Sequence, residues 1–456
     1  MQHLISRAAA RTHPLALALL TALGTGLAVA QTPPPMQWDP ARNNLGLGNN
    51  AGTTNITGKG NQAMGGNAGN NVATDWNLAI GQSAGNNVSG GNANQAIGYE
   101  SGNNVVGGWN QAFGRSAGRN VTGNYNNASG FWAGTDTTGS FNEAHGSNAG
   151  RNVDGNSNQA HGANAGNRVQ GDDNLAMGSN AGSNVTGANN VGLGAMAGSG
   201  VNGTANLALG QGAGSGVQGN HNQALGTAAG QGVVGTGNMA LGQAAGQHVQ
   251  GQRNVAIGND AGSYVSADDA VSIGSSARAS ATGAIALGAG AQATHASSIA
   301  LGAGSSTSRG ALASYQAAGL AQAQSSNGEV AVGQRQITGV AAASEATDAT
   351  NLGQVQGMVG QAMQHSDMAT AALRSELHET RRRAYAGIAG VAAMEAAPLV
   401  PGKTSYAVGM GNYRSESAVG ASVRHTFKDG RYSVTAGVGL SSSGAVSRVA
   451  FTGVFD

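Results

Sequence analysis

Residues 174–190 read Asn-Leu-Ala-Met-Gly-Ser-Asn-Ala-Gly-Ser-Asn-Val-Thr-Gly-Ala-Asn-Asn, and this stretch decides the fold. It is one copy of a repeat, Asn-x-Ala-h-Gly-x-x-Ala-Gly-x-x-Val-x-Gly, in which h is usually a large apolar residue. An asparagine stands four residues before the central glycine in every copy from Asn44 to Asn254, so the repeat is not a coincidence. The central glycine recurs every 16 or 17 residues and finally every 14, at positions 48, 65, 81, 98, 114, 130, 146, 162, 178, 194, 210, 226, 242, 258, 274, 288 and 302.

This period predicts a β-solenoid in which each repeat forms one coil. Two short strands and two turns fit into 14 to 17 residues, whereas repeats built from helical hairpins need about 33 residues or more. Strand alternation sends Leu175 and Met177 to one face and Ala176 to the other. Glycine at the corners supplies positive φ and lets neighbouring coils approach closely.

The asparagines are expected to stack, coil upon coil, as a hydrogen-bonded column at one turn. The column is represented by Asn174, Asn190, Asn206 and Asn222. The alanine and glycine interior of a single coil buries little apolar surface. The face that carries Leu193, Leu209, Leu225, Leu241 and Ile257 therefore needs a partner, most simply further copies of the chain.

Composition excludes several classes of protein. Among 456 residues 78 are glycine, 4% are aromatic and 9% are charged, which is too little bulk for one large globular core. With a net charge of +1, the chain lacks the excess of basic residues that binds the phosphates of nucleic acid. The chain has no cysteine, and no coil carries the paired carboxylates of a carbohydrate-cleaving solenoid. We therefore predict no catalytic residue, no metal site and no cofactor.

Two departures from the repeat leave alternatives open. His145 and His161 occupy the apolar h position in successive coils, either as drift at a tolerant position or as a stacked layer that responds to pH or binds a metal. Trp76, Trp109 and the pair Phe131–Trp132 fall mostly in turns. They are either packing residues against a neighbouring coil or chain, or exposed binding anchors.

The first 30 residues have the pattern of a secretory signal. Arg7 and Arg11 precede an apolar run that begins at Leu15, and Ala28-Val29-Ala30 forms an Ala-x-Ala cleavage site. We expect cleavage between Ala30 and Gln31.

After the repeats, a helix with coiled-coil spacing is expected. Its seam skips four residues once, which is a stutter. The seam residues are Leu352, Val355, Val359, Ala362, Ser366, Ala369 and Leu373, then Leu377, Thr380, Ala384, Ile388 and Val391.

Four segments of about ten residues end the chain, at 403–413, 416–427, 431–441 and 445–455, and this length suits one tilted crossing of an outer membrane. In the first three, large residues such as Tyr406, Val408 and Met410 alternate with tiny ones. The tiny residues predict an inward face packed closely around something inside. The predicted lumen glycines are Gly409, Gly411, Gly420, Gly437 and Gly439.

Four strands cannot close a barrel, and an open sheet edge is not tolerated in lipid. Two chains would supply eight strands and three chains twelve. Eight strands leave no lumen for helices, whereas twelve leave room for them, so the small inward residues and the preceding helices favour three chains.

Between the repeats and the helix lie Gly328–Gly333, Arg335–Ala341 and Ala346–Leu352. This segment resembles the neck of trimeric autotransporter adhesins, the YadA-like family, and the repeats resemble that family's head. The 14-residue coils at 271–304 match its head repeat best, and the order of head, neck, stalk and anchor is itself specific.

The resemblance implies a mostly β homotrimer with a β-solenoid (β-roll) head, a short coiled-coil stalk and a 12-stranded transmembrane barrel built from three chains around three helices. It also implies a location in the bacterial outer membrane and at the cell surface. The C-terminal aromatic residue, here Phe455 before Asp456, is read by the barrel-assembly machinery in that family. The expected partners are host matrix, cells, surfaces or the protein itself.

The predicted segments are a signal peptide (1–30), a Pro-rich linker (31–43), the head (44–310), the neck (311–353), the stalk (354–384) and the anchor (385–456). The predicted function is adhesion and self-aggregation, with the anchor supporting export of the head. A passive surface coat or spacer without a ligand is the alternative.

Overall fold

The computed structural model describes residues 36–455 and divides the chain into two units between Arg335 and Gln336. The predicted signal peptide and its cleavage site at Ala30 and Gln31 lie outside the described residues, as does Asp456.

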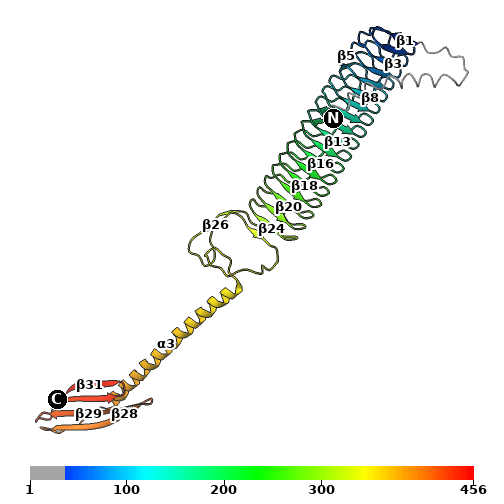
Figure 1. Ribbon diagram of the computed structural model, residues 1–456. Helices are drawn as coiled ribbons and strands as arrows, with labels where there is room; N and C mark the ends of the chain where they lie inside the picture. Colours follow the sequence, from blue (N-terminus) through cyan, green and yellow to red (C-terminus); the bar gives the residue numbers. More distant parts are fainter. Residues whose placement is uncertain (1–35, 456) are drawn as a thin grey trace. The chain divides into compact units, whose positions relative to one another are not determined.

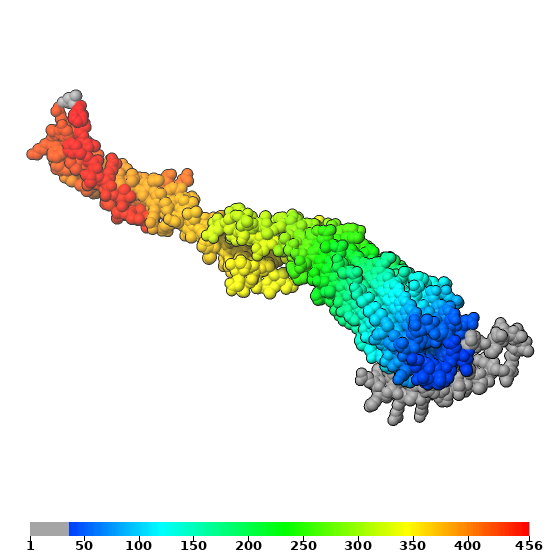
Figure 2. All heavy atoms as spheres, turned by 90° about the horizontal axis from the view of Figure 1, so that it is seen from above, coloured from blue at the N-terminus to red at the C-terminus, as the bar shows by residue number. Residues whose placement is uncertain are grey.

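The first unit is a β-solenoid, as predicted (Figure 1). Strands of mostly three residues pair in parallel with the strand one coil before and one coil after, so that Ala176 lies beside Gly192 and Met177 beside Leu193. Figure 2 shows the stacked coils, from blue to green, as one continuous column of atoms. The strands of this sheet are β1 (Met36–Asp39), β2 (Asn44–Leu47), β3 (Gln62–Met64), β4 (Leu78–Ile80), β6 (Gln95–Ile97), β8 (Gln111–Phe113), β9 (Asn127–Ser129), β10 (Glu143–His145), β11 (Gln159–His161), β13 (Leu175–Met177), β15 (Val191–Leu193), β16 (Leu207–Leu209), β17 (Gln223–Leu225), β18 (Met239–Leu241), β19 (Val255–Ile257), β20 (Val271–Ile273), β22 (Ile285–Leu287), β24 (Ile299–Leu301) and β27 (Val330–Ala331).

The opposite side of each coil is held by shorter pairings. They include isolated bridges such as the one between Asn202 and Gln218. The strands on this side are β5 (Val88–Gly90) and β7 (Val105–Gly107), β12 (Val169–Gln170) and β14 (Val185–Thr186), and β21 (Arg278–Ala279) and β23 (Gln292–Ala293).

Small residues fill the interior. A typical coil buries two alanines and a valine, such as Ala144, Ala149 and Val153. The central glycines allow neighbouring coils to approach closely. Gly178 has φ of 131°, and a Cβ placed on it would lie 2.7 Å from the carbonyl carbon of Gly194 in the next coil. Glycine tolerates both this conformation and this contact.

Both ends of the solenoid sheet are covered by additional strands. β1 pairs antiparallel with β2 at the first coil, and β27 pairs in parallel with β24 at the last. Between β24 and β27 the chain forms a separate hairpin, β25 (Leu312–Tyr315) and β26 (Gln324–Ser326). Covering the last coil matters because an unpaired strand edge is a site for aggregation.

The second unit consists of one helix and a four-stranded antiparallel sheet. The helix α3 (Leu352–Ala393) starts at a capping box, in which the Asn351 side chain accepts from the Gln354 backbone N–H at 3.0 Å and the Gln354 side chain accepts from the Asn351 N–H at 3.3 Å. The sheet strands β28 (Thr404–Tyr413), β29 (Glu416–Thr426), β30 (Tyr432–Ser441) and β31 (Gly444–Gly453) begin and end within two residues of the predicted segments.

Candidate functional site: a helix-packed sheet and an asparagine ladder

The inward face of the C-terminal sheet packs directly on α3. A Cβ placed on Gly439 would lie 2.1 Å from the carbonyl oxygen of Gly390, and one on Gly420 would lie 2.4 Å from that of Ala393. Gly411 and Gly409 meet the helix backbone at 2.5 and 2.8 Å, whereas the nearest atom to Gly437 is the Met394 sulfur at 3.3 Å. All five glycines named from the sequence therefore point at the helix or its end.

The outward face of the sheet is apolar and exposed. Tyr406 and Met410 are each 78% exposed, and a similar row continues over the neighbouring strands. The further large side chains of this face are Val408, Val419, Val423, Val434, Val438, Leu440, Val449 and Phe451. Large residues outside and tiny ones inside are the pattern of a strand wall in a membrane.

The helix has a second apolar face that the single chain leaves uncovered. Ala386, Ala389 and Gly390 are buried against the sheet. Ile388 and Val391, which belong to the predicted seam, remain about half exposed, at 45% and 52%. Further along, Leu373 and Leu377 are also exposed. An exposed apolar face of this kind is typical of an interaction surface.

Two edges of the sheet are also open within one chain. Among residues 36–455, β28 pairs only with β29, and β31 pairs only with β30. The fold within residues 36–455 contains no helix that is both long and apolar enough to cross a membrane.

The asparagines form a continuous hydrogen-bonded ladder in the first unit. Asn206 is 5% exposed; its Nδ2 donates to Asn190 Oδ1 at 3.0 Å and to the Gly219 carbonyl at 2.8 Å. Its Oδ1 accepts from the backbone N–H and the Nδ2 of Asn222, at 3.0 and 3.1 Å. Asn190 and Asn174 make the same contacts one and two coils earlier. Each side chain thus links three coils.

The structure also places the other residues that the sequence singled out. The rings of His145 and His161 stack with centroids 5.0 Å apart on the exposed side of β10 and β11. Among residues 36–455, no group of three or more His, Cys, Asp or Glu residues could hold a metal ion. Phe455, the predicted insertion signal, is 88% exposed.

Sequence reasoning missed a group of arginines beside the aromatic residues. Arg115 lies between the rings of Tyr99 and Phe131, one coil before and one coil after it. Aligning the repeats on their central glycines would have found this group, because all three residues follow that glycine directly.

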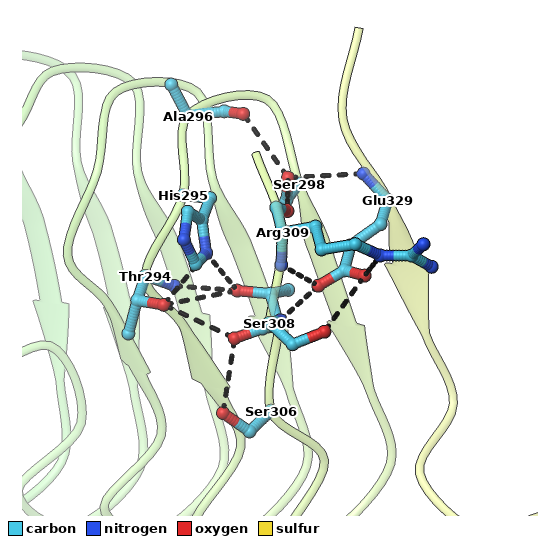
Figure 3. Close-up of polar contacts among 9 residues, drawn as sticks. Thr294, His295, Ala296, Ser298, Ser306, Ser308, Arg309 and Glu329 are labelled. Atoms are coloured by element: carbon cyan, nitrogen blue, oxygen red, sulfur yellow. Dashed lines mark hydrogen bonds and ion pairs between the residues drawn. The ribbon is translucent and has the colours of Figure 1, made fainter. Parts of the chain in front are cut away.

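Sequence reasoning also missed a carboxylate clasp at the end of the solenoid (Figure 3). The Glu329 carboxylate accepts the backbone N–H groups of Ser308 and Arg309, the latter at 2.7 Å. The Glu329 backbone N–H donates to Ser298 Oγ at 3.2 Å and its carbonyl accepts from the Ile299 N–H at 2.8 Å. Glu329 therefore ties β27 and the segment after the last coil to β24.

Replacing Glu329 with alanine should loosen this segment, because the N–H groups of Ser308 and Arg309 lose their acceptor. Both N–H groups lie at exposed positions where water can replace the acceptor, so the loss is that of net hydrogen bonds, about 0.5–1.5 kcal/mol each. We expect trypsin to cleave after Arg309 several-fold faster in Glu329→Ala than in the parent. Glu345→Ala, at an exposed position of the second unit, is the matched control. Equal cleavage rates in all three proteins would contradict the clasp.

The clasp should also open in acid. The Arg309 N–H, and to a lesser degree that of Ser308, hold the pKa of Glu329 below its ordinary value. A carboxylate with a lowered native pKa stabilises the fold fully above its unfolded pKa, about 4.3, and loses that effect as pH falls through the native value. Amide exchange at Ser308 and Arg309, corrected for intrinsic rates, should therefore accelerate below about pH 4 in the parent and be fast at every pH in Glu329→Ala.

Comparisons with known proteins agree with this geometry. Residues 396–450 match the YadA-like membrane anchor domain. A stretch of 91 residues is 41% identical to the trimeric autotransporter adhesin AtaA of Acinetobacter sp. (strain Tol 5). That stretch is 20% of this chain and 2% of AtaA, so the chain matches only a small part of that relative. The two matches confirm the resemblance to trimeric autotransporter adhesins, and they place the protein in the outer membrane and at the cell surface.

Proposed function

We propose that three copies of this chain form a surface adhesin, in which a shared C-terminal barrel anchors and helps to export an adhesive head. The observation that carries the proposal is the second unit: a four-stranded sheet with two open edges, a lipid-compatible outer face and an inner face that fits a helix. The proposal is also supported by the match of residues 396–450 to the YadA-like membrane anchor domain.

The number of chains follows from the open edges and the helix. β31 of one copy can pair with β28 of the next, which satisfies backbone groups that would otherwise face lipid. Eight strands from two chains would have too narrow an interior for two helices. Twelve strands from three chains would enclose three helices, with the exposed face of Ile388 and Val391 turned toward the other two helices.

The head gives an independent reason for assembly. Along its main sheet an apolar column runs from coil to coil, and Leu241, Leu287 and Leu301 in it are about 40% exposed in the single chain. Covering this column by two other copies would bury apolar surface worth about 25 cal/mol per Å². The trimer would then display every coil three times, so that weak contacts add up to avidity.

Adhesion is proposed toward host matrix, cells, surfaces or other copies of the protein, and Phe455 is proposed as the residue that the barrel-assembly machinery reads. The test compares cells that express the full chain with cells that express only residues 385–456. Adhesion or clumping by the first cells alone supports an adhesin. Equal behaviour at equal surface levels would favour the passive spacer instead.

A further inference from the structure

We infer that the head binds a linear polysaccharide carrying carboxylate or sulfate groups, through one patch of aromatic and arginine side chains. This inference deepens the proposed adhesive function and rests on it for its biological purpose. The aromatic–arginine patch consists of Tyr99, Arg115, Arg119, Phe131, Trp132 and Arg151.

One half of the patch is a stack along the coils. The Arg115 guanidinium lies 5.6 Å from the ring centroid of Tyr99 and 5.6 Å from that of Phe131. The two rings are 42% and 44% exposed. A guanidinium held between ring faces keeps its N–H groups in its own plane, where they can bind an oxyanion with two hydrogen bonds.

The other half surrounds Trp132. The Arg151 guanidinium lies 5.0 Å from the Trp132 ring centroid and that of Arg119 lies 5.9 Å from it. Arg119 also pairs with Glu100 at 3.6 Å. The Nε of Arg151 is buried and has no hydrogen-bond partner within the described chain. An external ligand cannot reach this covered atom, so any contact from Arg151 is made by its terminal N–H groups.

The balance of charge selects an anionic ligand. Among residues 36–455, neither Arg115 nor Arg151 forms an ion pair, and Glu100 is the one carboxylate paired with the patch. The patch therefore carries an excess of positive charge on a chain whose net charge is only +1. Three arginines are too few for the many phosphate contacts by which nucleic acid is held.

The arrangement along the solenoid favours a linear sugar chain over a compact anion. Arg119 and Arg151 occupy the same repeat position two coils apart, and Arg115 lies in the same coil as Arg119. The cations therefore lie in two coils that are about 10 Å apart along the rod. Ring faces attract the partly positive C–H groups of a sugar. By contrast, Trp109, Tyr125 and Phe141 on another turn are 50–58% exposed but stack on one another, and no guanidinium among residues 36–455 lies over them.

The test measures binding of heparin (sulfated), hyaluronate (carboxylated) and neutral dextran to the immobilised full-length protein in detergent. We expect heparin, hyaluronate or both to bind, and dextran not to bind. The double variant Arg115→Gln/Arg151→Gln should weaken binding of the anionic probe by about tenfold or more. Phe131→Leu, which changes no charge, should weaken it by a smaller factor.

Arg253→Gln is the control for charge: it removes one positive charge, against two in the double variant, from a position about six to eight coils away, where Arg253 pairs with Asp269 at 2.6 Å. It should bind like the parent, and all variants should show the parent's thermal melt. No binding of either anionic probe, equal loss in Arg253→Gln, or unchanged binding in the double variant would overturn the inference. If poly-glutamate binds as tightly as the anionic polysaccharides and loses binding in the same arginine variants, the inference would be overturned as well. Cells that express the full chain are also scored for adhesion. Adhesion of these cells without polysaccharide binding by the protein would contradict this inference and leave the proposed function standing.

Discussion

Gly439→Ala should prevent stable assembly of the anchor, although it adds only one methyl group. The new Cβ would lie 2.1 Å from the backbone oxygen of Gly390, and neither the helix nor the strand can move away without losing its other contacts. Overpacking of this kind costs about 1–3 kcal/mol or more per site, or roughly 3–9 kcal/mol for three copies. We expect the variant to lose most of its heat-resistant oligomer and of its surface display.

Gly437→Ala is the matched control two residues earlier on the same strand. Its Cβ would lie 3.3 Å from the Met394 sulfur, at the end of a flexible side chain that can shift. Tyr406→Phe, on the outward face, should also be tolerated. Phenylalanine at Gly437 or at Gly409, by contrast, is expected to be too large for the space beside the helix and to impair insertion. Equal surface levels of Gly439→Ala and Gly437→Ala would mean that α3 does not pack on this face of the sheet.

Asn206→Ala should strongly destabilise the head. It removes both side-chain hydrogen bonds donated to the preceding coil and the corner, and both bonds accepted from Asn222. The Gly219 carbonyl and the Asn222 N–H are left without these partners, at about 1–3 kcal/mol each. The expected loss is therefore roughly 2–6 kcal/mol per chain.

Asn202→Ala, in the same coil, provides the comparison. Its side chain is exposed and outside the ladder, and its backbone N–H bond to Val217 is kept in the variant. Exposed substitutions of this kind usually stay within about 0.5 kcal/mol. Thermal melts of residues 31–353 decide the matter: if Asn206→Ala melts like Asn202→Ala and the parent, the ladder does not hold the coils together.

The predictable parts of the fold are those that the sequence repeats. One asparagine at a constant distance from each central glycine was enough to predict the coils, and alternation at Tyr406, Val408 and Met410 was enough to predict the strands and their two faces. Both patterns arise from local geometry, which is the same in every copy.

The unpredicted parts occur once and depend on distant contacts. β27 returns to cover the last coil after a long connection, and the Glu329 clasp forms only because of that return. The difference between Gly437 and Gly439 depends on where α3 ends, beside Met394, which no strand pattern reveals. The arginines around Trp132 occupy a variable position of the repeat, and their meeting depends on the register of the coils.

The central claim, that three chains share one barrel, is tested most directly by the mass of the full-length protein purified from outer membranes in mild detergent. Native mass spectrometry should give three chains before heating and one chain after denaturation. Three chains fit because the sheet of a single copy has two open edges and a helix with an uncovered apolar face. A mass of one or two chains in the unheated sample would contradict the account.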